Sequence, residues 1–249
     1  MSNLFSVNGK NALVTGGTRG IGRAICELFL AQGAALQVVA RGEEELAQRL
    51  EEWRTAGGQA DGIVADVSTS EGRWKVIHAL RERWERLDIF VNCAGTNIRR
   101  KSVDYTIEEY RHIIDTNATA AFELSRHLFP LLRNAAQRAG HGPEGAAVVF
   151  IGSTAGLSTV PTGAPYAMSK AALDQLTRYL AVEWASDGIR VNSVAPWYIR
   201  TPLVEGVLSN EQYYDTVIDR TPLGRIGEPI EVAAATAFLC AAGASFITG

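Results

Sequence analysis

The sequence predicts an α/β domain with a doubly wound parallel sheet, and three observations support this fold class. Short runs rich in β-branched residues alternate with longer amphipathic runs, as in a parallel sheet covered by helices on both faces. A glycine-rich turn separates the first short run from the first amphipathic run. The chain has 249 residues and no linker, repeat or low-complexity segment, so we expect one domain over residues 1–249.

The candidate strands are short and apolar, because strands of a parallel sheet are buried on both faces. They are Asn11–Thr15, Ala35–Ala40, Gly62–Ala65, Asp88–Asn92, Ala147–Gly152 and Arg190–Val194. The candidate helices are Ile21–Gln32, Glu43–Ala56, Ser70–Arg86, Ile107–Ala118, Ala120–Arg138 and Tyr166–Ser186. Residues Ala139–Gly145 are expected to form a polar loop. The pattern predicts the strand order 3-2-1-4-5-6.

Composition argues against several classes of function. The net charge is −3, from 24 Lys and Arg against 27 Asp and Glu, which offers no excess of positive charge for nucleic acid. No apolar run approaches the ~20 residues that span a bilayer, so no membrane segment is expected. The first ten residues lack a signal-peptide pattern, and a cytoplasmic location is the expectation. The three cysteines and four histidines have neither disulfide-framework nor metal-ligand spacing, so no metal is expected.

A glycine-rich loop, Thr15–Gly22, follows the first strand and begins the first helix. Glycines permit close approach of backbone N–H groups to a pyrophosphate, and the helix N-terminus adds partial positive charge. The spacing is Gly-x-x-x-Gly-x-Gly, which differs from the usual dinucleotide motif, and a glycine-rich turn without a ligand is the alternative. The strand before the loop and the helix after it favour dinucleotide binding.

The end of the second strand predicts which dinucleotide is preferred. An acidic residue there would bind the ribose 2′-hydroxyl of NAD, but this strand ends in Ala40 and Arg41. Arg41, with Arg19 in the loop, is suited to a 2′-phosphate, so we expect NADPH to be preferred over NADH. Asp66 is a candidate partner for the adenine, and a helix cap is its equally weighted alternative.

Tyr166 and Lys170 are four residues apart at the start of a predicted helix, so they share one face. A free tyrosine keeps its proton at neutral pH, and a nearby ammonium stabilises the phenolate, which suits general acid–base catalysis. Ser153 lies at the end of the preceding strand, where its hydroxyl could bind a substrate carbonyl. The Tyr-x-x-x-Lys pattern is weak alone but specific after a glycine-rich turn and a strand-end serine.

Together these motifs resemble the short-chain dehydrogenase/reductase family over nearly the whole chain, and the family implies a Rossmann-type fold. The matching pieces are Thr15–Gly22, Asp66-Val67, Asn92-Cys-Ala-Gly95, Asn117, Ser153, Tyr166-Ala-Met-Ser-Lys170 and Arg190–Pro196. Within the family the chain is most similar to the tropinone reductase-like group. That similarity lies in Trp53, Leu124–Arg126, Pro130–Leu132, Ala181–Trp184, Thr201–Val204 and Ile247–Gly249.

The resemblance implies a role for each matching residue. Tyr166 would protonate the carbonyl oxygen, Lys170 would hold the nicotinamide ribose and support Tyr166, and Ser153 would orient the carbonyl. Asn117 would fix a water in a proton relay, with a helix residue that satisfies its own backbone as the alternative. The implied cofactor-binding set is Gly16, Thr18, Arg19, Gly20, Ile21, Gly22, Ala40, Arg41, Asp66, Val67, Asn92, Ala94, Gly95, Tyr166, Lys170, Pro196 and Thr201.

Three features depart from the family pattern. Cys93 replaces a usual second asparagine, so a hydrogen bond that supports the sheet is expected to be missing. Trp197 replaces a usual glycine and brings an aromatic ring near the nicotinamide pocket. The chain ends at Gly249, where family members continue, so the family's final strand is expected to be absent.

Residues 196–223 are expected to form a lid over the substrate. The candidate pocket residues Leu157, Trp197, Tyr198, Leu203 and Leu208 favour an apolar ketone or a bulky cyclic alcohol over a sugar acid, although packing of the lid explains any one of them equally well. Two alternatives stay open. Arg99, Arg100 and Lys101 could serve a 3-oxoacyl-carrier reductase, and the fold could belong to a non-catalytic dinucleotide-binding protein. The helices Ile107–Ala118 and Ala120–Arg138 predict a homodimer or homotetramer.

Overall fold

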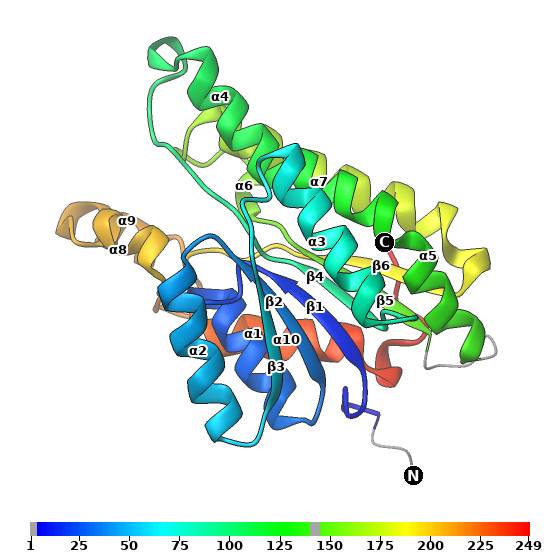
Figure 1. The fold of residues 1–249 in the computed structure, drawn as a ribbon. Helices are drawn as coiled ribbons and strands as arrows, with labels where there is room; N and C mark the ends of the chain where they lie inside the picture. Colours follow the sequence, from blue (N-terminus) through cyan, green and yellow to red (C-terminus); the bar gives the residue numbers. More distant parts are fainter. Residues whose placement is uncertain (1–3, 140–144) are drawn as a thin grey trace.

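Six parallel strands form the sheet of the computed structural model, in the order β3-β2-β1-β4-β5-β6 (Figure 1). Their bounds are β1 Asn11–Thr15, β2 Ala35–Ala40, β3 Gln59–Val64, β4 Ile89–Asn92, β5 Ala146–Ile151 and β6 Ile189–Val194. The structure describes residues 4–139 and 145–249, so most of the expected loop 139–145 lies outside the described residues. The predicted fold class and strand order are confirmed. The order reverses between β1 and β4, where doubly wound sheets bind ligands.

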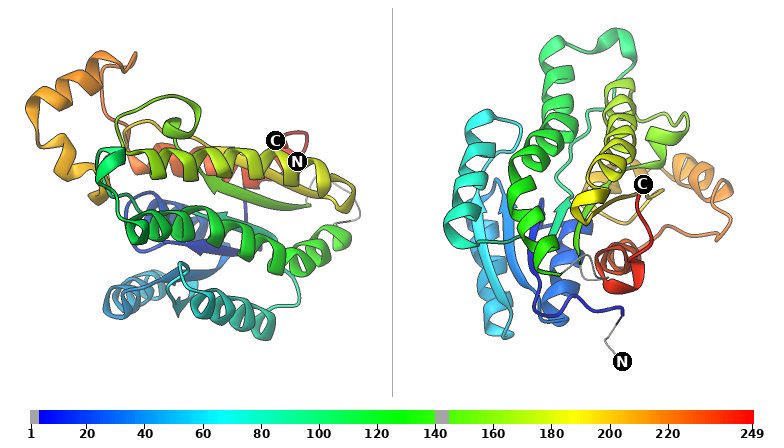
Figure 2. Two further views of the ribbon diagram at one scale, coloured as in Figure 1. Left: turned by 90° about the horizontal axis from the view of Figure 1, so that it is seen from above. Right: turned by 90° about the vertical axis from the view of Figure 1, so that its right-hand side faces the viewer.

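Helices cover both faces of this sheet (Figures 1 and 2). One face holds α1 (Gly20–Ala31), α2 (Glu43–Thr55) and α10 (Pro229–Cys240), and the other holds α3 (Ser70–Arg83), α4 (Ile107–Ile114), α5 (Ala120–Arg138) and α7 (Ala164–Glu183). Shorter helices are α6 (Thr154–Leu157), α8 (Pro202–Leu208) and α9 (Glu211–Asp219). Single 3-10 turns occupy Ser102–Asp104, Ala185–Asp187 and Ala242–Ala244. In Figure 2, α8 and α9 project from the body of the domain.

Alternate residues of the strands point to opposite faces of the sheet, and this divides the core into two layers. Leu13, Phe90 and Phe150 pack beneath α3, α5 and α7, and the rings of Phe90 and Phe150 meet edge-on at 6.5 Å. Val14 and Val91 pack on the opposite face beneath α1, α2 and α10. Burial on both faces explains why the strands are uniformly apolar.

Most helix and strand bounds shift by a few residues from the sequence prediction, and two of the differences have a clear structural cause. β3 begins at Gln59 instead of Gly62, because the polar residues before Gly62 also pair with β2. The two helices expected between residues 107 and 138 form one continuous helix, joined by a π turn over Asp115–Thr119. Thr119 keeps helical dihedral angles, so the chain does not break between α4 and α5. π turns occur often at functional sites, and this one contains Asn117.

The prediction omitted α10 and the lid helices. Helix α10 is apolar on nearly all sides, so it has no amphipathic period to detect. It packs against α1 and buries Val232, Ala233 and Ala237 on the sheet face. A helix that packs on several sides has the same uniformly apolar sequence as a buried strand, so sequence periodicity does not distinguish the two.

The residues after α10 return to the outer edge of β6. Arg190 donates to the carbonyl oxygens of Leu239 at 2.7 Å and Ala241 at 3.3 Å, and so links β6 to the end of α10. The backbone N–H of Gly249 donates to the carbonyl of Val191 at 2.8 Å. The sheet of the described residues has six strands, and β6 is its last strand on this side.

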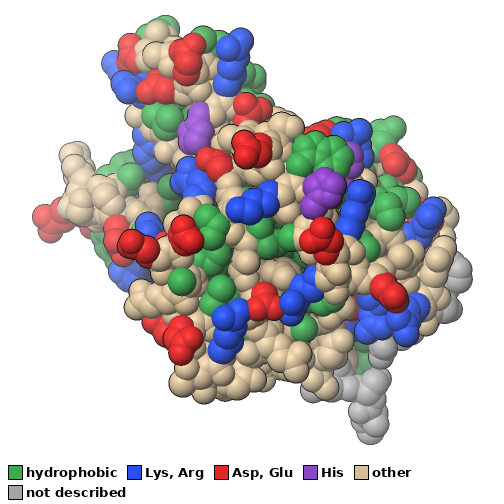
Figure 3. Space-filling view, in the orientation of Figure 1, with side chains coloured by type: hydrophobic (Ala, Val, Ile, Leu, Met, Phe, Trp, Pro, Cys, Tyr) green, Lys and Arg blue, Asp and Glu red, His purple; other side chains and the backbone are tan. Residues whose placement is uncertain are grey.

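Acidic and basic side chains are interspersed on the face shown in Figure 3. Over residues 4–139 and 145–249, none of the helices combines the length and apolar character that a bilayer crossing requires. The same residues contain no cluster of three or more His, Cys, Asp or Glu arranged to hold a metal ion.

Candidate active site

The carboxyl ends of β1, β4, β5 and β6 open into a cavity of about 450 Å³. Twelve residues predicted to bind the cofactor line it: Gly16, Arg19, Gly20, Ile21, Gly22, Arg41, Ala94, Gly95, Tyr166, Lys170, Pro196 and Thr201. Five others are not part of the lining: Thr18, Ala40, Asp66, Val67 and Asn92. The sequence reasoning missed Thr96, Ile151, Gly152, Ile199, Pro202 and Val204, although each lies close in the chain to a predicted site residue.

The phosphate loop is shaped by contacts that only glycine permits. Gly16 has a φ of +70°, and a Cβ atom there would lie 2.9 Å from the backbone of Ala94. A Cβ atom on Gly22 would lie 2.1 Å from the carbonyl oxygen of Gly16. Arg19 precedes α1 and makes no side-chain cap, so the first N–H groups of α1 remain available to a ligand. This cradle fits a pyrophosphate group.

Both predicted arginines line this cavity, and each has an acidic neighbour. Nε of Arg19 lies 2.5 Å from a carboxylate oxygen of Glu45 at the start of α2. The guanidinium of Arg41 lies 4.0 Å from the carboxylate of Asp66. Burial acts to raise the pKa of Asp66, but hydrogen bonds from Ser68 and the charge of Arg41 outweigh it and hold that pKa below its ordinary value. Sequence reasoning had missed Glu45.

Asp66 also has a local structural role. Its Oδ1 accepts from the backbone N–H of Ser68 at 2.9 Å. The cap of α3 is Thr69, whose hydroxyl accepts from Gly72 at 3.0 Å. Asp66 therefore stabilises the turn before the helix without capping it.

The candidate catalytic residues meet where the cavity reaches β5. Nζ of Lys170 is buried, donates to the carbonyl of Ile151 at 2.7 Å and lies 5.7 Å from the centre of the Tyr166 ring. Ser153 follows β5, and its hydroxyl accepts from the N–H of Ala155 at 3.1 Å, which caps α6. Tyr166 and Ser153 line both this cavity and the smaller pocket beside it. A proton donor, a hydroxyl and an ammonium are thus placed together.

Asn117 is fully buried, and its amide joins three elements. Oδ1 accepts from the N–H of Thr96 at 2.8 Å, and Nδ2 donates to the carbonyl of Thr96 at 2.9 Å and to the hydroxyl of Ser169 at 2.9 Å. Asn117 therefore fastens the loop after β4 to α7 and makes no side-chain bond to its own helix. A Cβ atom on Gly95 would lie 3.6 Å from both Asn117 and Lys170, so these residues converge at one point.

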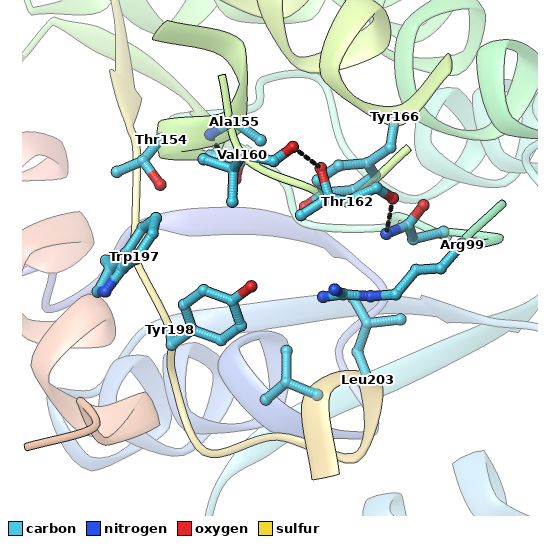
Figure 4. Close-up of a pocket in the computed structure, with 12 residues that line it drawn as sticks. Arg99, Thr154, Ala155, Val160, Thr162, Tyr166, Trp197, Tyr198 and Leu203 are labelled. Atoms are coloured by element: carbon cyan, nitrogen blue, oxygen red, sulfur yellow. Dashed lines mark hydrogen bonds between the residues drawn. The ribbon is translucent and has the colours of Figure 1, made fainter. Parts of the chain in front are cut away.

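The smaller pocket lies between Tyr166 and the lid (Figure 4). Of the predicted pocket residues, Trp197, Tyr198 and Leu203 line it. Leu157 is 65 % exposed, and Leu208 packs within the lid. The lining missed by sequence reasoning is Asn97, Thr154, Ala155, Val160 and Thr162, and the lining also includes Arg99 and Val204. The pocket has about 60 Å³ of free space, so a substrate must be small or displace lid residues.

The two large aromatic residues at the start of the lid pack against each other. The rings of Trp197 and Tyr198 meet edge-on at 4.8 Å, and Nε1 of Trp197 donates to the hydroxyl of Thr221 at 3.0 Å. The indole is therefore fixed at the pocket wall, where it limits the size and shape of a ligand.

The three basic residues Arg99, Arg100 and Lys101 do not form a common patch. Arg99 turns into the pocket, whereas the guanidinium of Arg100 pairs with Glu109 at 2.8 Å on the surface. This separation weakens the sequence argument that these residues form a docking surface for an acidic carrier protein.

Comparison with known proteins agrees with this geometry. The family model described as enoyl-(acyl carrier protein) reductase matches residues 16–249. A tropinone reductase homologue from Arabidopsis thaliana is 46% identical over 98% of this chain and 90% of its own length. The chain belongs to the short-chain dehydrogenase/reductase family. Among solved structures, a short-chain type dehydrogenase/reductase from Mycobacterium marinum is similar with a TM-score of 0.88, 32% identity, and coverage of 99% of this chain and 94% of that one.

A second solved structure bears on the cofactor. The Pseudomonas aeruginosa protein RhlG, in an NADP active-site complex, is similar with a TM-score of 0.91 and 35% identity. The similarity covers 100% of this chain and 95% of that one. The present chain is thus an oxidoreductase of the short-chain dehydrogenase/reductase family, similar to the tropinone reductase homologues.

Cys93, the departure from the family pattern directly after β4, lines the larger cavity. Its N–H donates to the hydroxyl of Thr15 at 3.2 Å, and the same hydroxyl donates to Asn92 at 3.1 Å, so Thr15 links β1 to β4. The amide nitrogen of buried Asn92 has no protein partner among the described residues. Burial raises the pKa of the Cys93 thiol to about 11, although Lys170 acts to lower it.

We expect Cys93 to react slowly with iodoacetamide near neutral pH, because only the thiolate reacts and burial suppresses it. The rate should rise about tenfold per pH unit below the pKa of the thiol. Mass spectrometry of the labelled peptides measures this, and buried Cys26 and Cys240 serve as internal controls. A pH-independent rate would contradict the assignment of a protonated thiol.

Proposed function

We propose that this protein is an NADP(H)-dependent reductase of small ketones and the corresponding secondary alcohols. The observation that supports it best is the convergence of Ser153, Tyr166 and Lys170 where the glycine-rich cradle and the smaller pocket meet. Carbonyl reduction requires three parts, which are a cradle for a dinucleotide, a proton donor, and a hydroxyl that binds the carbonyl oxygen.

The protein's own residues have distinct tasks in this reaction. When bound, the reduced nicotinamide supplies the hydride that the carbonyl carbon accepts. Tyr166 gives its proton to the carbonyl oxygen, so that a ketone becomes a secondary alcohol. Ser153 donates a hydrogen bond to that oxygen and polarises it. Lys170, held by Ile151, stabilises the phenolate that Tyr166 becomes until a proton from solvent replaces the lost one.

The side-chain amide of Asn117 supports this group through its hydrogen bonds. It holds Thr96, next to the cavity, and Ser169, next to Lys170. We propose that this arrangement fixes the floor of the site and orders a water beside Lys170 for the proton relay. The convergence of Gly95, Asn117 and Lys170 supports that assignment.

Cofactor choice follows from charge at the adenosine end. Arg19 and Arg41 offer two guanidinium groups there, and both side chains are more than half exposed, so they are free to turn towards a 2′-phosphate. Glu45 competes for Arg19 and would be repelled by the phosphate. The similar structure with NADP in its active site supports the same choice.

The alternatives have less support. The sequence argument for a 3-oxoacyl-carrier reductase was a common basic cluster. It is weakened because Arg99 lies in the pocket, whereas Arg100 pairs with Glu109 on the surface. A non-catalytic dinucleotide-binding protein would have no need for a lysine buried beside the tyrosine of its cavity. Small-molecule reduction, with residues 196–223 as the lid, is the function that the arrangement favours.

The central prediction concerns Tyr166. Tyr166→Phe removes only the hydroxyl and should lower kcat for ketone reduction by about 10²–10⁴, the usual effect of losing a general acid. Affinity for NADPH, measured by fluorescence titration, should change little. Tyr179→Phe, on an exposed part of the same helix, is the matched control and should keep full activity. Near-parent turnover in Tyr166→Phe would disprove the assignment.

A second prediction concerns cofactor preference. The parent protein should have a higher kcat/KM with NADPH than with NADH. The double variant Ala40→Asp with Arg41→Gln should reverse that order, because a carboxylate then binds the ribose hydroxyl and repels the phosphate. Arg23→Gln removes an arginine paired with Glu27 outside the cavity and should leave the preference unchanged. Equal use of both cofactors by the parent would refute the proposal.

A third prediction concerns assembly. Exposed apolar side chains on α4, α5 and α7, among them Ile107, Phe122 and Val182, support a homodimer or homotetramer. Light scattering at micromolar concentration should give a multiple of the chain mass. A replacement of Phe122 and Val182 by Glu should shift the protein towards monomer, and a monomeric parent would exclude this interface.

A further inference from the structure

The guanidinium of Arg99 is an unused positive charge inside the smaller pocket. Arg99 lies on the loop after β4, is half-buried, and extends towards Tyr198 in Figure 4. Across residues 4–139 and 145–249, no carboxylate lies within 4.0 Å of it. Its neighbour Arg100, by contrast, is exposed and paired with Glu109.

The protein groups around Arg99 are neutral. Its guanidinium donates to the hydroxyl of Tyr213 at 3.3 Å and lies 6.0 Å from the centre of that ring. The hydroxyls of Tyr213 and Tyr198 are hydrogen-bonded to each other. Burial raises the pKa of Tyr198 to about 12, so this phenol is uncharged in the physiological range.

Arg99 keeps its charge in this setting. Burial acts to lower the pKa of its guanidinium, but the tyrosine hydroxyls act in the opposite sense and hold that pKa above its ordinary value. A partly desolvated cation with only neutral partners is costly, and an anion that binds it gains a charge-assisted contact at little further desolvation cost. The arginine fork matches a carboxylate in shape.

We propose that the substrate is a small carbonyl compound that carries a carboxylate, which Arg99 binds while the carbonyl group lies at Ser153 and Tyr166. This inference rests on the proposed carbonyl reduction and names its substrate class. It departs from the sequence-based expectation of an apolar ketone or a bulky cyclic alcohol, because that expectation was drawn from the aromatic and apolar lid residues and did not count Arg99 as a substrate contact. Cationic ketones should be poor substrates, since the same charge repels them.

The test compares acids with uncharged amides of nearly equal size. Levulinate and levulinamide form one pair, and cyclohexanonecarboxylate and its amide form a second pair with a different reach. With NADPH, the parent protein should reduce the acid of at least one pair with a kcat/KM about 10- to 100-fold higher than its amide, as expected for a charge-assisted contact. Equal rates within both pairs, or a preference for the amides, would overturn the proposal.

Variants assign that preference to Arg99. Arg99→Gln should abolish it mainly by raising KM for the acid, while the amide is reduced as before. Arg99→Lys should restore part of it, because the ammonium keeps the charge without the planar fork. Arg100→Gln is the matched control and should behave as the parent. An equal loss for acid and amide in Arg99→Gln would indicate a packing role and contradict carboxylate binding.

A binding measurement separates this inference from the proposed function. Calorimetry with the non-reducible ligands cyclohexanecarboxylate and cyclohexanecarboxamide, with and without NADP⁺, should detect the acid in the parent and not in Arg99→Gln. If no ketone is reduced but this difference is found, carbonyl reduction fails and the anion site stands. If ketones are reduced but the acid binds no better than the amide, the reduction stands and the anion site is refuted.

Discussion

The hydrogen bonds of one buried amide hold the candidate site together. Asn117 lies in the π turn between α4 and α5, and its side chain binds both the N–H and the carbonyl of Thr96 as well as the hydroxyl of Ser169. It thereby ties the loop that leaves β4 to the helix that presents Tyr166 and Lys170. Because every polar atom of the amide is used, its position is determined by three elements at once. The position of α7 relative to the loop after β4 depends on this fixed point.

Charge is distributed along the cavity in an order that suits an elongated ligand with anionic groups. Arg19 and Arg41 lie at one end, each with an acidic neighbour, and buried Lys170 lies at the centre on the carbonyl of Ile151. Arg99 lies beyond Tyr166, with tyrosine hydroxyls as its only protein partners among the described residues. Arg19 and Arg41 must leave their acidic neighbours before they can bind an anionic ligand. Arg99 has no carboxylate partner among the described residues that a ligand would have to replace. The far end of the pocket is therefore the stronger candidate for recognition of an anionic group.

The lid connects these features to the size of the ligand. Trp197 is hydrogen-bonded to Thr221, and Tyr198 packs in a small apolar cluster with Val217 and with Ile226, which lies just beyond residues 196–223. Residues 196–223 therefore have a small core of their own, and Ile199 joins them to the layer beneath α1, α2 and α10. A rearrangement of α8 and α9, which belong to neither main layer, would change the pocket volume with little effect on the sheet.

The sequence by itself determined the doubly wound sheet and its strand order, and it singled out Ser153, Tyr166 and Lys170 as the candidate catalytic residues. These rest on local patterns: apolar runs of strand length, a glycine-rich turn, and an i, i+4 pair on one helix face. Only the tertiary structure decided the direction of Arg99, the partners of Asn117 and the contact of Glu45 with Arg19. Each of these contacts joins residues more than twenty positions apart. Their geometry depends on how loops pack across strand ends, and no local periodicity in the chain encodes that packing.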